Sequence, residues 1–188
     1  MTVKRFSDLC FVTLLFLPVF FITLAIFLLI KIDSAGPVLH WSKRVGSNNK
    51  IFLMPKFRTM FMDTPDCATH LLDNPRQHIT KIGKFLRKSS LDELPQLYSV
   101  LRGDMSMVGP RPALHNQYDL IKLRTVKDIH HLRPGITGWA QVNGRDSISI
   151  QDKVEYDEQY LDKQSLFFDM KIVFLTFASV LNKQGVSH

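Results

Sequence analysis

The chain has 188 residues, which is enough for one domain with a real hydrophobic core and too few for two comfortable domains. Its two cysteines, one of them inside an apolar run, exclude a disulfide-stapled fold. The formal net charge of +7 favours anionic partners such as lipid headgroups or phosphates. The basic region lacks the interleaved aromatic residues of nucleic-acid binders, so we expect no nucleic-acid partner.

Residues 9–30 form an uncharged apolar run that would span about 33 Å as a helix, close to the hydrocarbon thickness of a bilayer. A cleaved signal peptide is the weaker reading, because the run is long and no good cleavage site follows it. Pro18 lies in the middle of the run and predicts a kink. Two geometries stay open: a kinked helix that crosses the bilayer, or a helix-break-helix that returns to the same side. Lys4, Arg5 and Lys31 flank both ends, so the charge rule does not choose between them.

After this run, short strands are predicted at residues 38–41 and 50–58, on either side of the turn-rich residues 46–49. A polar surface loop is expected over residues 62–80, and a short basic helix over residues 82–88. Residues 31–112 hold 13 Lys/Arg against 7 Asp/Glu, so the basic excess lies beside the apolar run and the acid pair. Such a face suits anionic lipids or phosphates, although a solvated basic surface has the same composition.

Two adjacent carboxylates, Asp92 and Glu93, follow the basic helix. Pro95 is tolerated only in the first turn of a helix, so it places both acids at or just outside a helix start. Apolar residues then recur at helical spacing up to a stop signal at Gly103. An ionised carboxylate at this place can act as a nucleophile or a metal ligand. Ser90-x-x-Glu93 also matches a capping box, and a helix cap is the commoner use of such a pattern.

Further along, Arg111 stands between two prolines that fix its backbone on both sides. A rigidly presented Arg can grip a phosphate bidentately, although an ordinary turn with a solvated Arg is the simpler reading. Residues 139–142 are predicted to form a strand that ends in a tight turn at residues 143–144, as part of a hairpin or loop. Arg145 follows this turn and need not touch anything on this reading.

The last third of the chain is predicted to be helical. A helix of mixed charge is expected over residues 151–162, and the apolar residues 166–181 are too short and too interrupted for a second membrane span. Those residues either pack in the core or lie on the membrane surface with their aromatic face down. His130 and His131 are adjacent and should point in different directions, so a metal site on them is not expected. A hard cation such as Mg²⁺ on Asp92 or Glu93 is the better hypothesis.

The motifs together are more specific than each motif alone. They are the apolar N-terminal run with its central Pro, KFRTM (56–60), LRKSSLDELPQL (86–97), GDMSMVGPRP (103–112) and RPGITGWAQVNGR (133–145). In this combination the chain closely resembles the bacterial sugar transferase family, the small monotopic phosphoglycosyl transferases that start glycan assembly on a lipid carrier. The resemblance covers nearly the whole chain.

The resemblance implies a reaction. A UDP-sugar would give its sugar-1-phosphate to polyprenol (undecaprenyl) phosphate, releasing UMP, through a covalent phosphosugar on an aspartate. Asp92 would be that nucleophile, and Glu93 would assist and share a Mg²⁺ cofactor with it.

The basic residues of the same motifs would handle the phosphates. By the resemblance, Lys56, Arg87 and Arg111 would bind phosphate oxygens, while Arg145 would lie near the nucleotide or the leaving phosphate.

The fold implied is α+β and mainly helical. Residues 1–32 would be a re-entrant membrane helix broken at Pro18, and residues 33–188 a cytoplasmic catalytic domain with short strands and membrane-surface amphipathic helices. The expected location is the inner membrane, with downstream glycosyltransferases as partners in the first membrane step of glycoconjugate assembly. The alternative is a membrane-tethered scaffold or binding protein whose basic face recruits lipids or other assembly enzymes.

Overall fold

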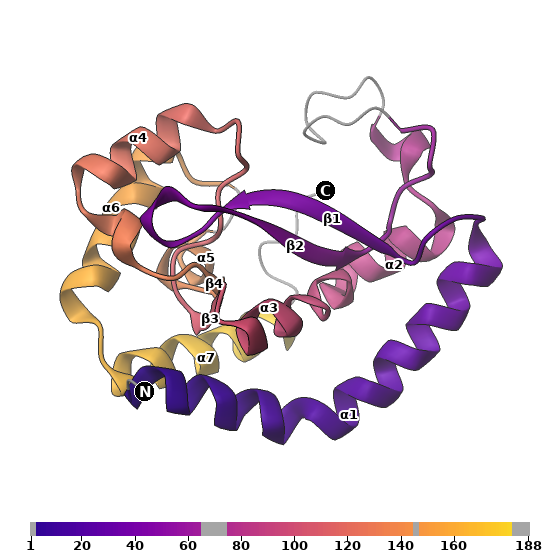
Figure 1. Ribbon diagram of the computed structural model, residues 1–188, viewed down its shortest axis with the longest axis horizontal. Coiled ribbons are helices and arrows are strands. Elements are labelled where there is room, and N and C mark those ends of the chain that lie inside the picture. Colours follow the sequence, from indigo (N-terminus) through magenta and orange to yellow (C-terminus); the bar gives the residue numbers. More distant parts are fainter. Residues whose placement is uncertain (1–2, 65–74, 145–146, 182–188) are drawn as a thin grey trace.

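A long N-terminal helix curves along one side of the molecule, and the other elements lie on its concave side (Figure 1). The computed structural model describes residues 3–64, 75–144 and 147–181. The helices are α1 (Val3–Asp33), α2 (Lys81–Ser89), α3 (Gln96–Arg102), α4 (Tyr118–Val126), α5 (Trp139–Val142), α6 (Ile150–Lys163) and α7 (Leu166–Leu181). The strands are β1 (Leu39–Val45), β2 (Ile51–Phe57), β3 (Ser106–Val108) and β4 (Gly135–Thr137). Short 3₁₀ turns complete the fold: η1 (Ser47–Asn49), η3 (Pro75–His78), η4 (Leu91–Glu93) and η5 (Ile129–His131). The prediction of a mainly helical α+β chain is confirmed.

Helix α1 runs without interruption through Pro18, which is its central residue. Figure 1 shows α1 bent about midway along its length, as expected where a proline removes one hydrogen bond and crowds the preceding turn. The predicted kink is therefore seen as a bend. The break expected at Pro18 is absent. In place of a helix-break-helix, the structure has one continuous, bent helix.

Both ends of α1 are fastened to the rest of the molecule, whereas its middle faces outward. Its buried residues are Asp8, Val12, Ile26 and Ile30, which lie toward the two ends. Between them the large exposed side chains are all apolar: Leu14, Phe16, Leu17, Phe20, Phe21, Ile22 and Leu24. By length and composition α1 could cross a membrane, and the remaining described residues form no other such helix.

The attachments at the two ends of α1 reach the helices on either side of the acid pair. At one end, the Arg5 guanidinium donates to the carbonyl oxygens of Val100 and Leu101 in the last turn of α3. At the other end, Asp33 Oδ2 accepts a hydrogen bond from the N–H of Ile82 in the first turn of α2 (3.0 Å). Helix α1 thus caps the outer ends of α2 and α3.

Strands β1 and β2 form an antiparallel hairpin whose register runs from Leu39 opposite Phe57 to Val45 opposite Ile51. Asn48 and Asn49 adopt left-handed conformations in the connecting turn, which asparagine tolerates better than most residues. The predicted strands and turn are confirmed, although β1 extends further than expected.

Strands β3 and β4 pair in parallel, with Ser106 opposite Gly135. The prediction of a strand at residues 139–142 is wrong, because these residues form the short helix α5 and the strand is the segment just before it. Gly138 separates the two at a point where a Cβ would lie 2.1 Å from the carbonyl oxygen of Gly109. A four-residue apolar run fits a strand or a helical turn equally well, which explains the error.

Helices α6 and α7 complete the fold. The predicted helix at residues 151–162 is confirmed as α6, and Ser149 and Asp152 form a capping box at its start. In α7, Ile172 is fully buried against Val108 and Tyr160. The opposite stripe is exposed and consists of Phe167, Met170, Phe174 and Phe177. The alternative that α7 packs in the core is therefore confirmed for one of its faces. Its other face is aromatic and exposed, and the membrane-surface alternative stays a prediction.

Candidate active site

The acid pair lies in the 3₁₀ turn η4, between the end of α2 and the start of α3. Ser90 has a φ of 56° and ends α2; it makes no side-chain capping hydrogen bond, so the predicted capping box with Glu93 is wrong. Helix α3 begins directly after Pro95 and ends at Gly103, whose φ is 92°. Asp92 therefore lies just outside a helix start, as predicted, but as part of a separate turn.

Glu93 is held between two cations that come from distant parts of the chain. Its Oε1 atom accepts hydrogen bonds from Lys56 Nζ (2.8 Å) on β2 and from Arg111 Nη2 (3.0 Å) in the loop after β3. The Glu93 side chain is only 12% exposed. The structure therefore brings together three of the residues that the sequence analysis selected.

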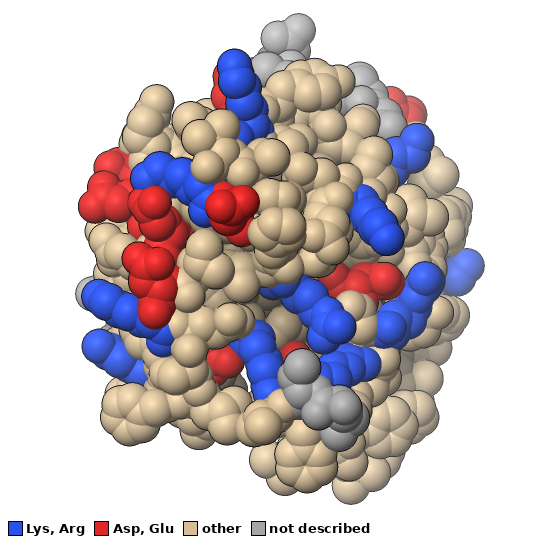
Figure 2. All heavy atoms as spheres, turned by 60° about the vertical axis from the view of Figure 1, so that its left-hand side comes forward, with Lys and Arg blue, Asp and Glu red and all other residues tan. Residues whose placement is uncertain are grey.

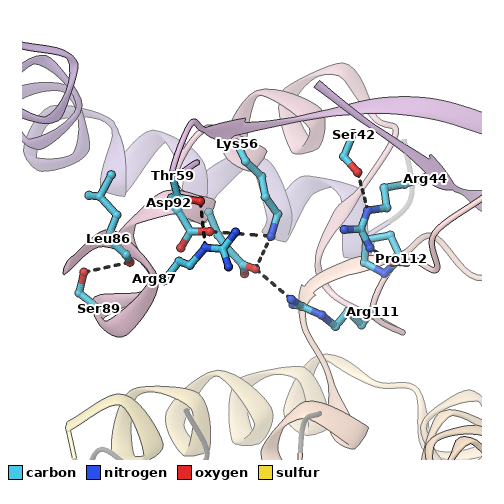
Figure 3. Close-up of polar contacts among 11 residues, drawn as sticks. Ser42, Arg44, Lys56, Thr59, Leu86, Arg87, Ser89, Asp92, Arg111 and Pro112 are labelled. Carbon is cyan, nitrogen blue, oxygen red and sulfur yellow. Dashed lines mark hydrogen bonds and ion pairs between the residues drawn. The ribbon is translucent and has the colours of Figure 1, made fainter. Parts of the chain in front are cut away.

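Asp92 lies beside the same cations but is held more loosely. Its Oδ2 atom is 4.0 Å from Lys56 Nζ, beyond hydrogen-bonding distance. In Figure 3, Lys56, Arg87 and Arg111 point toward the acid pair from three directions. Arg87 interacts electrostatically with Asp92 and donates from Nε to Thr59 Oγ1 (2.9 Å). The Asp92 carboxylate is thus surrounded by positive charge and lies farther from Lys56 than the Glu93 carboxylate does.

The two carboxylates differ in acidity. Burial alone would raise the pKa of Glu93, but Arg111 and Lys56 outweigh it and hold the pKa well below its ordinary value. Burial raises the pKa of Asp92, which Lys56 opposes and the neighbouring Glu93 charge increases. A carboxylate with a raised pKa is the more basic and more nucleophilic of the two. The two acids are therefore chemically different. Glu93 stays ionised, with its charge compensated by Lys56 and Arg111, whereas Asp92 is the more reactive carboxylate.

The loop that presents Arg111 is held by its main chain. The N–H of Gly109 donates to Thr137 (2.9 Å), and the carbonyl of Pro110 accepts from Gly135 (2.9 Å). On the other side, Arg44 donates to the carbonyl of Pro112 (3.1 Å). The prediction that the flanking prolines present Arg111 rigidly is consistent with this bonding.

The site has the charge balance of an anion-binding pocket. Lys56, Arg87 and Arg111 provide three positive charges against two carboxylates. Figure 2 shows one face on which Lys and Arg side chains border a hollow with acidic side chains inside it. An excess of positive charge around buried carboxylates suits a substrate that brings phosphates. Arg145, which was also predicted to bind near the nucleotide, lies outside the described residues.

Two residues of the KFRTM segment have roles that the sequence did not indicate. Thr59, which is buried, orients Arg87 through its hydroxyl. Arg58 is 5% exposed and donates to the carbonyls of Ser34 and Ala35, so it fixes the chain after α1. Arg58 is therefore a structural cation, although its place in the motif beside Lys56 gave no sign of the difference.

The prediction that His130 and His131 point in different directions is wrong. Their rings lie together in η5, with centroids 3.9 Å apart and planes tilted by 38°. With Asp128 they place three potential ligand atoms within 4.8 Å of one another. Asp128 and His131 are mostly exposed, and His131 Nδ1 is paired with Asn48 (2.8 Å).

The acid pair is chemically suited to a hard cation. Mg²⁺ takes oxygen ligands and often uses only one or two protein carboxylates together with substrate phosphates. Asp92 fits this use because its Oδ2 atom lies beyond hydrogen-bonding distance of Lys56 Nζ (4.0 Å). Glu93 fits less well, since its Oε1 already accepts from Lys56 and Arg111.

The chain matches a known family along nearly its whole length. The family model described as bacterial sugar transferase matches residues 1–183, so the chain belongs to the bacterial sugar transferase family. The resemblance found in the sequence motifs is thereby confirmed.

Several curated relatives are about 40% identical to the chain over the aligned residues. The uncharacterized sugar transferase EpsL of Bacillus subtilis is 42% identical over 99% of this chain and 91% of its own length. The UDP-glucose:undecaprenyl-phosphate glucose-1-phosphate transferase of Escherichia coli is 42% identical over 96% of this chain, but only 40% of its own length. The exopolysaccharide production protein ExoY of Rhizobium meliloti is 40% identical over 92% of this chain and 81% of its own length. The chain therefore spans nearly all of some relatives and less than half of others.

Proposed function

We propose that the protein is a phosphoglycosyl transferase that moves sugar-1-phosphate from a UDP-sugar to polyprenol phosphate and releases UMP. The observation that carries this proposal is the pairing of a loosely held Asp92 with a Glu93 whose charge is already compensated, inside a ring of three cations. The names of relatives such as the Escherichia coli glucose-1-phosphate transferase support the same substrate class. The first membrane step of glycoconjugate assembly is the corresponding role.

The chemistry has two displacement steps at one phosphorus atom. An Asp92 carboxylate oxygen attacks the phosphorus that bears the sugar, and the bond to the bridging oxygen breaks, so UMP leaves with that oxygen. A phosphate oxygen of polyprenol phosphate then attacks the same phosphorus, which breaks the bond to Asp92 and restores the carboxylate. The product is a polyprenol diphosphate sugar.

The roles proposed for Lys56, Arg87, Arg111 and Glu93 follow from their positions, and the role of Arg145 follows from the family resemblance. Lys56, Arg87 and Arg111 bind the phosphate oxygens and offset the repulsion between the carboxylate and the diphosphate. Glu93 holds Lys56 and Arg111 in place and keeps the Asp92 carboxylate basic. Arg145 is proposed to reach the nucleotide.

Mg²⁺ is the proposed cofactor. Asp92 would hold it, with Glu93 as a weaker contributor, and the metal would supply neutralisation of charge on the diphosphate. We expect UMP release to require Mg²⁺ and to fall to background with a chelator.

The test of the proposed function uses the purified full chain with Mg²⁺, polyprenol phosphate and a panel of UDP-sugars, with UMP release as the measurement. We expect UMP from at least one UDP-sugar, and a labelled sugar phosphate on the protein when the acceptor is left out. If no UDP-sugar yields UMP, the transferase proposal is wrong. A scaffold would instead be insensitive to Asp92→Asn in cells and sensitive to charge reversal of its surface lysines.

We further propose that α1 is re-entrant and that the molecule sits on the cytoplasmic face of the inner membrane. Arg5 at one end of α1 and Asp33 at the other both contact the same body of short helices. A spanning helix would put those two ends on opposite sides of the bilayer. The exposed apolar middle of α1 and the aromatic stripe of α7 provide surfaces that lipid would cover.

Cysteine labelling tests this topology. In a Cys10→Ser/Cys67→Ser background, Val3→Cys and Ile32→Cys place thiols at the two exposed ends of α1. A reagent confined to the periplasm should modify neither in intact cells and both after permeabilisation. Phe20→Cys is the control for lipid cover and should stay protected in both states. Labelling of Val3→Cys or Ile32→Cys in intact cells would exclude the re-entrant arrangement.

A further inference from the structure

A buried ion pair lies directly behind the loop that presents Arg111. Arg124 on α4 donates from Nε (2.9 Å) and Nη2 (2.6 Å) to Oδ2 of Asp157 on α6. Asp157 is 1% exposed, and the Arg124 side chain is 11% exposed. Helices α4 and α6 lie side by side, so the pair links their facing surfaces (Figure 1).

The third contact of Arg124 leads to the candidate active site. Its Nη1 atom donates to the main-chain carbonyl of Arg111 (2.8 Å). The Arg111 side chain in turn donates to Glu93 (3.0 Å). Hydrogen bonds therefore run without a gap from the buried Asp157 to the acid pair.

This arrangement is costly for a purely structural link. Two charges taken out of water must recover a large desolvation penalty, and well-packed apolar residues often stabilise a fold as well or better. Burial raises the pKa of Asp157 in spite of Arg124, so burial destabilises the ionised carboxylate more than the arginine stabilises it. The ion pair does fix the orientation of the Arg124 guanidinium. One of its N–H groups then points at the Arg111 carbonyl.

Resting on the function proposed above, we propose that Arg124, oriented by Asp157, is a positioning residue that sets the place of Arg111 in the phosphate site. The bonds from β4 and from Arg44 hold the residues on either side of Arg111. Arg124 is the contact on the carbonyl of Arg111 itself. Because misplacing a binding group by about 1 Å can cost about 100-fold in rate, the loss of this bond should be visible in turnover.

A double-mutant cycle tests the proposal. The pair variant Arg124→Met/Asp157→Leu replaces the buried charges with apolar side chains, so that no lone charge stays inside. It is compared with Arg111→Met and with the combination of all three substitutions, by measuring kcat and KM for the UDP-sugar. The matched control is Lys127→Met/Glu158→Leu, which removes an exposed ion pair joining the same region of α4 to α6. Thermal unfolding of each variant reports its fold.

We expect the pair variant to lower kcat/KM about 10- to 100-fold, while the control keeps wild-type kinetics. In the Arg111→Met background the pair substitutions should cost less than about 2-fold more, because Arg124 acts through Arg111. An unchanged kcat/KM in a folded pair variant, or an equal loss with and without Arg111, would overturn the proposal.

A second variant covers the case in which the pair variant does not fold. Arg124→Lys keeps the charge opposite Asp157, but one ammonium group cannot reproduce the fork that reaches both the carboxylate and the Arg111 carbonyl. It should unfold near the wild-type temperature and still lose turnover; wild-type turnover would contradict the proposal. These results are ratios to the active wild type, so a failed transferase assay of the wild type is a separate outcome.

Discussion

Replacing Asp92 with Asn is expected to abolish UMP release, by about 10³-fold or more, while the protein stays folded. The amide cannot attack phosphorus, and no other described carboxylate in the site can replace it, because Glu93 Oε1 accepts from both Lys56 and Arg111. UMP release and labelling of the protein with sugar phosphate should disappear together. Asp104→Asn is the control, since Asp104 pairs with Arg102 on α3 and takes no part in the site.

The stability of the Asp92→Asn variant should separate a catalytic role from a structural one. Burial raises the pKa of Asp92, so above its ordinary pKa of 3.8 the ionised carboxylate costs folding free energy. Removing that charge should leave the free energy of unfolding at pH 7 unchanged or higher. Urea unfolding in detergent measures this. A clear loss of stability together with the loss of turnover would mean that Asp92 holds the fold.

Glu93→Gln is expected to lose both activity and stability. Without the carboxylate charge, Lys56 and Arg111 lose their shared buried partner, and breaking such a pair costs about 3 kcal/mol. Turnover should fall about 100-fold, because two cations that are proposed to bind phosphate lose their fixed positions. The Asp92 carboxylate should also become more acidic, because the Glu93 charge raises its pKa in the wild type.

The pH dependence of this variant checks the cause. The pKa of Glu93 is lowered in the folded protein, so its stabilising effect is fully present above its ordinary pKa of 4.5 and is lost as the pH falls toward the folded value. The stability difference between wild type and Glu93→Gln should therefore be constant at neutral pH and shrink below about pH 4.5. A difference that does not change in acid would show that the charge of Glu93 is not its source.

The residues that could be predicted from the sequence are those whose local chemistry is unusual. Adjacent acids before a helix proline, and an arginine between two prolines, are local patterns that singled out Asp92, Glu93 and Arg111, although each pattern also has a common structural use. The hairpin turn and α6 were also readable, because asparagine-rich turns and helical periodicity are local signals. Lys56 and Arg87 were assigned through the family resemblance rather than from such signals.

What could not be predicted depends on contacts between distant segments. The role of Ser90 was misread because a serine before a helix looks the same whether it caps that helix or ends the previous one. Nothing in the sequence separates Lys56, which reaches the acid pair, from Arg58, which is buried beneath the end of α1. Asp157 lies among other charged residues of α6, and only the fold shows that it faces inward.

The capping of α2 and α3 by the two ends of α1 bears on protein engineering. Asp33 covers the start of one helix beside the turn that carries the acid pair, and Arg5 covers the end of the other. Cutting away the anchor to obtain a water-soluble enzyme would remove both caps and the apolar residues that α1 adds to two core clusters. A truncated or chimeric version must therefore graft a substitute for these contacts, and a generic membrane tether cannot replace α1.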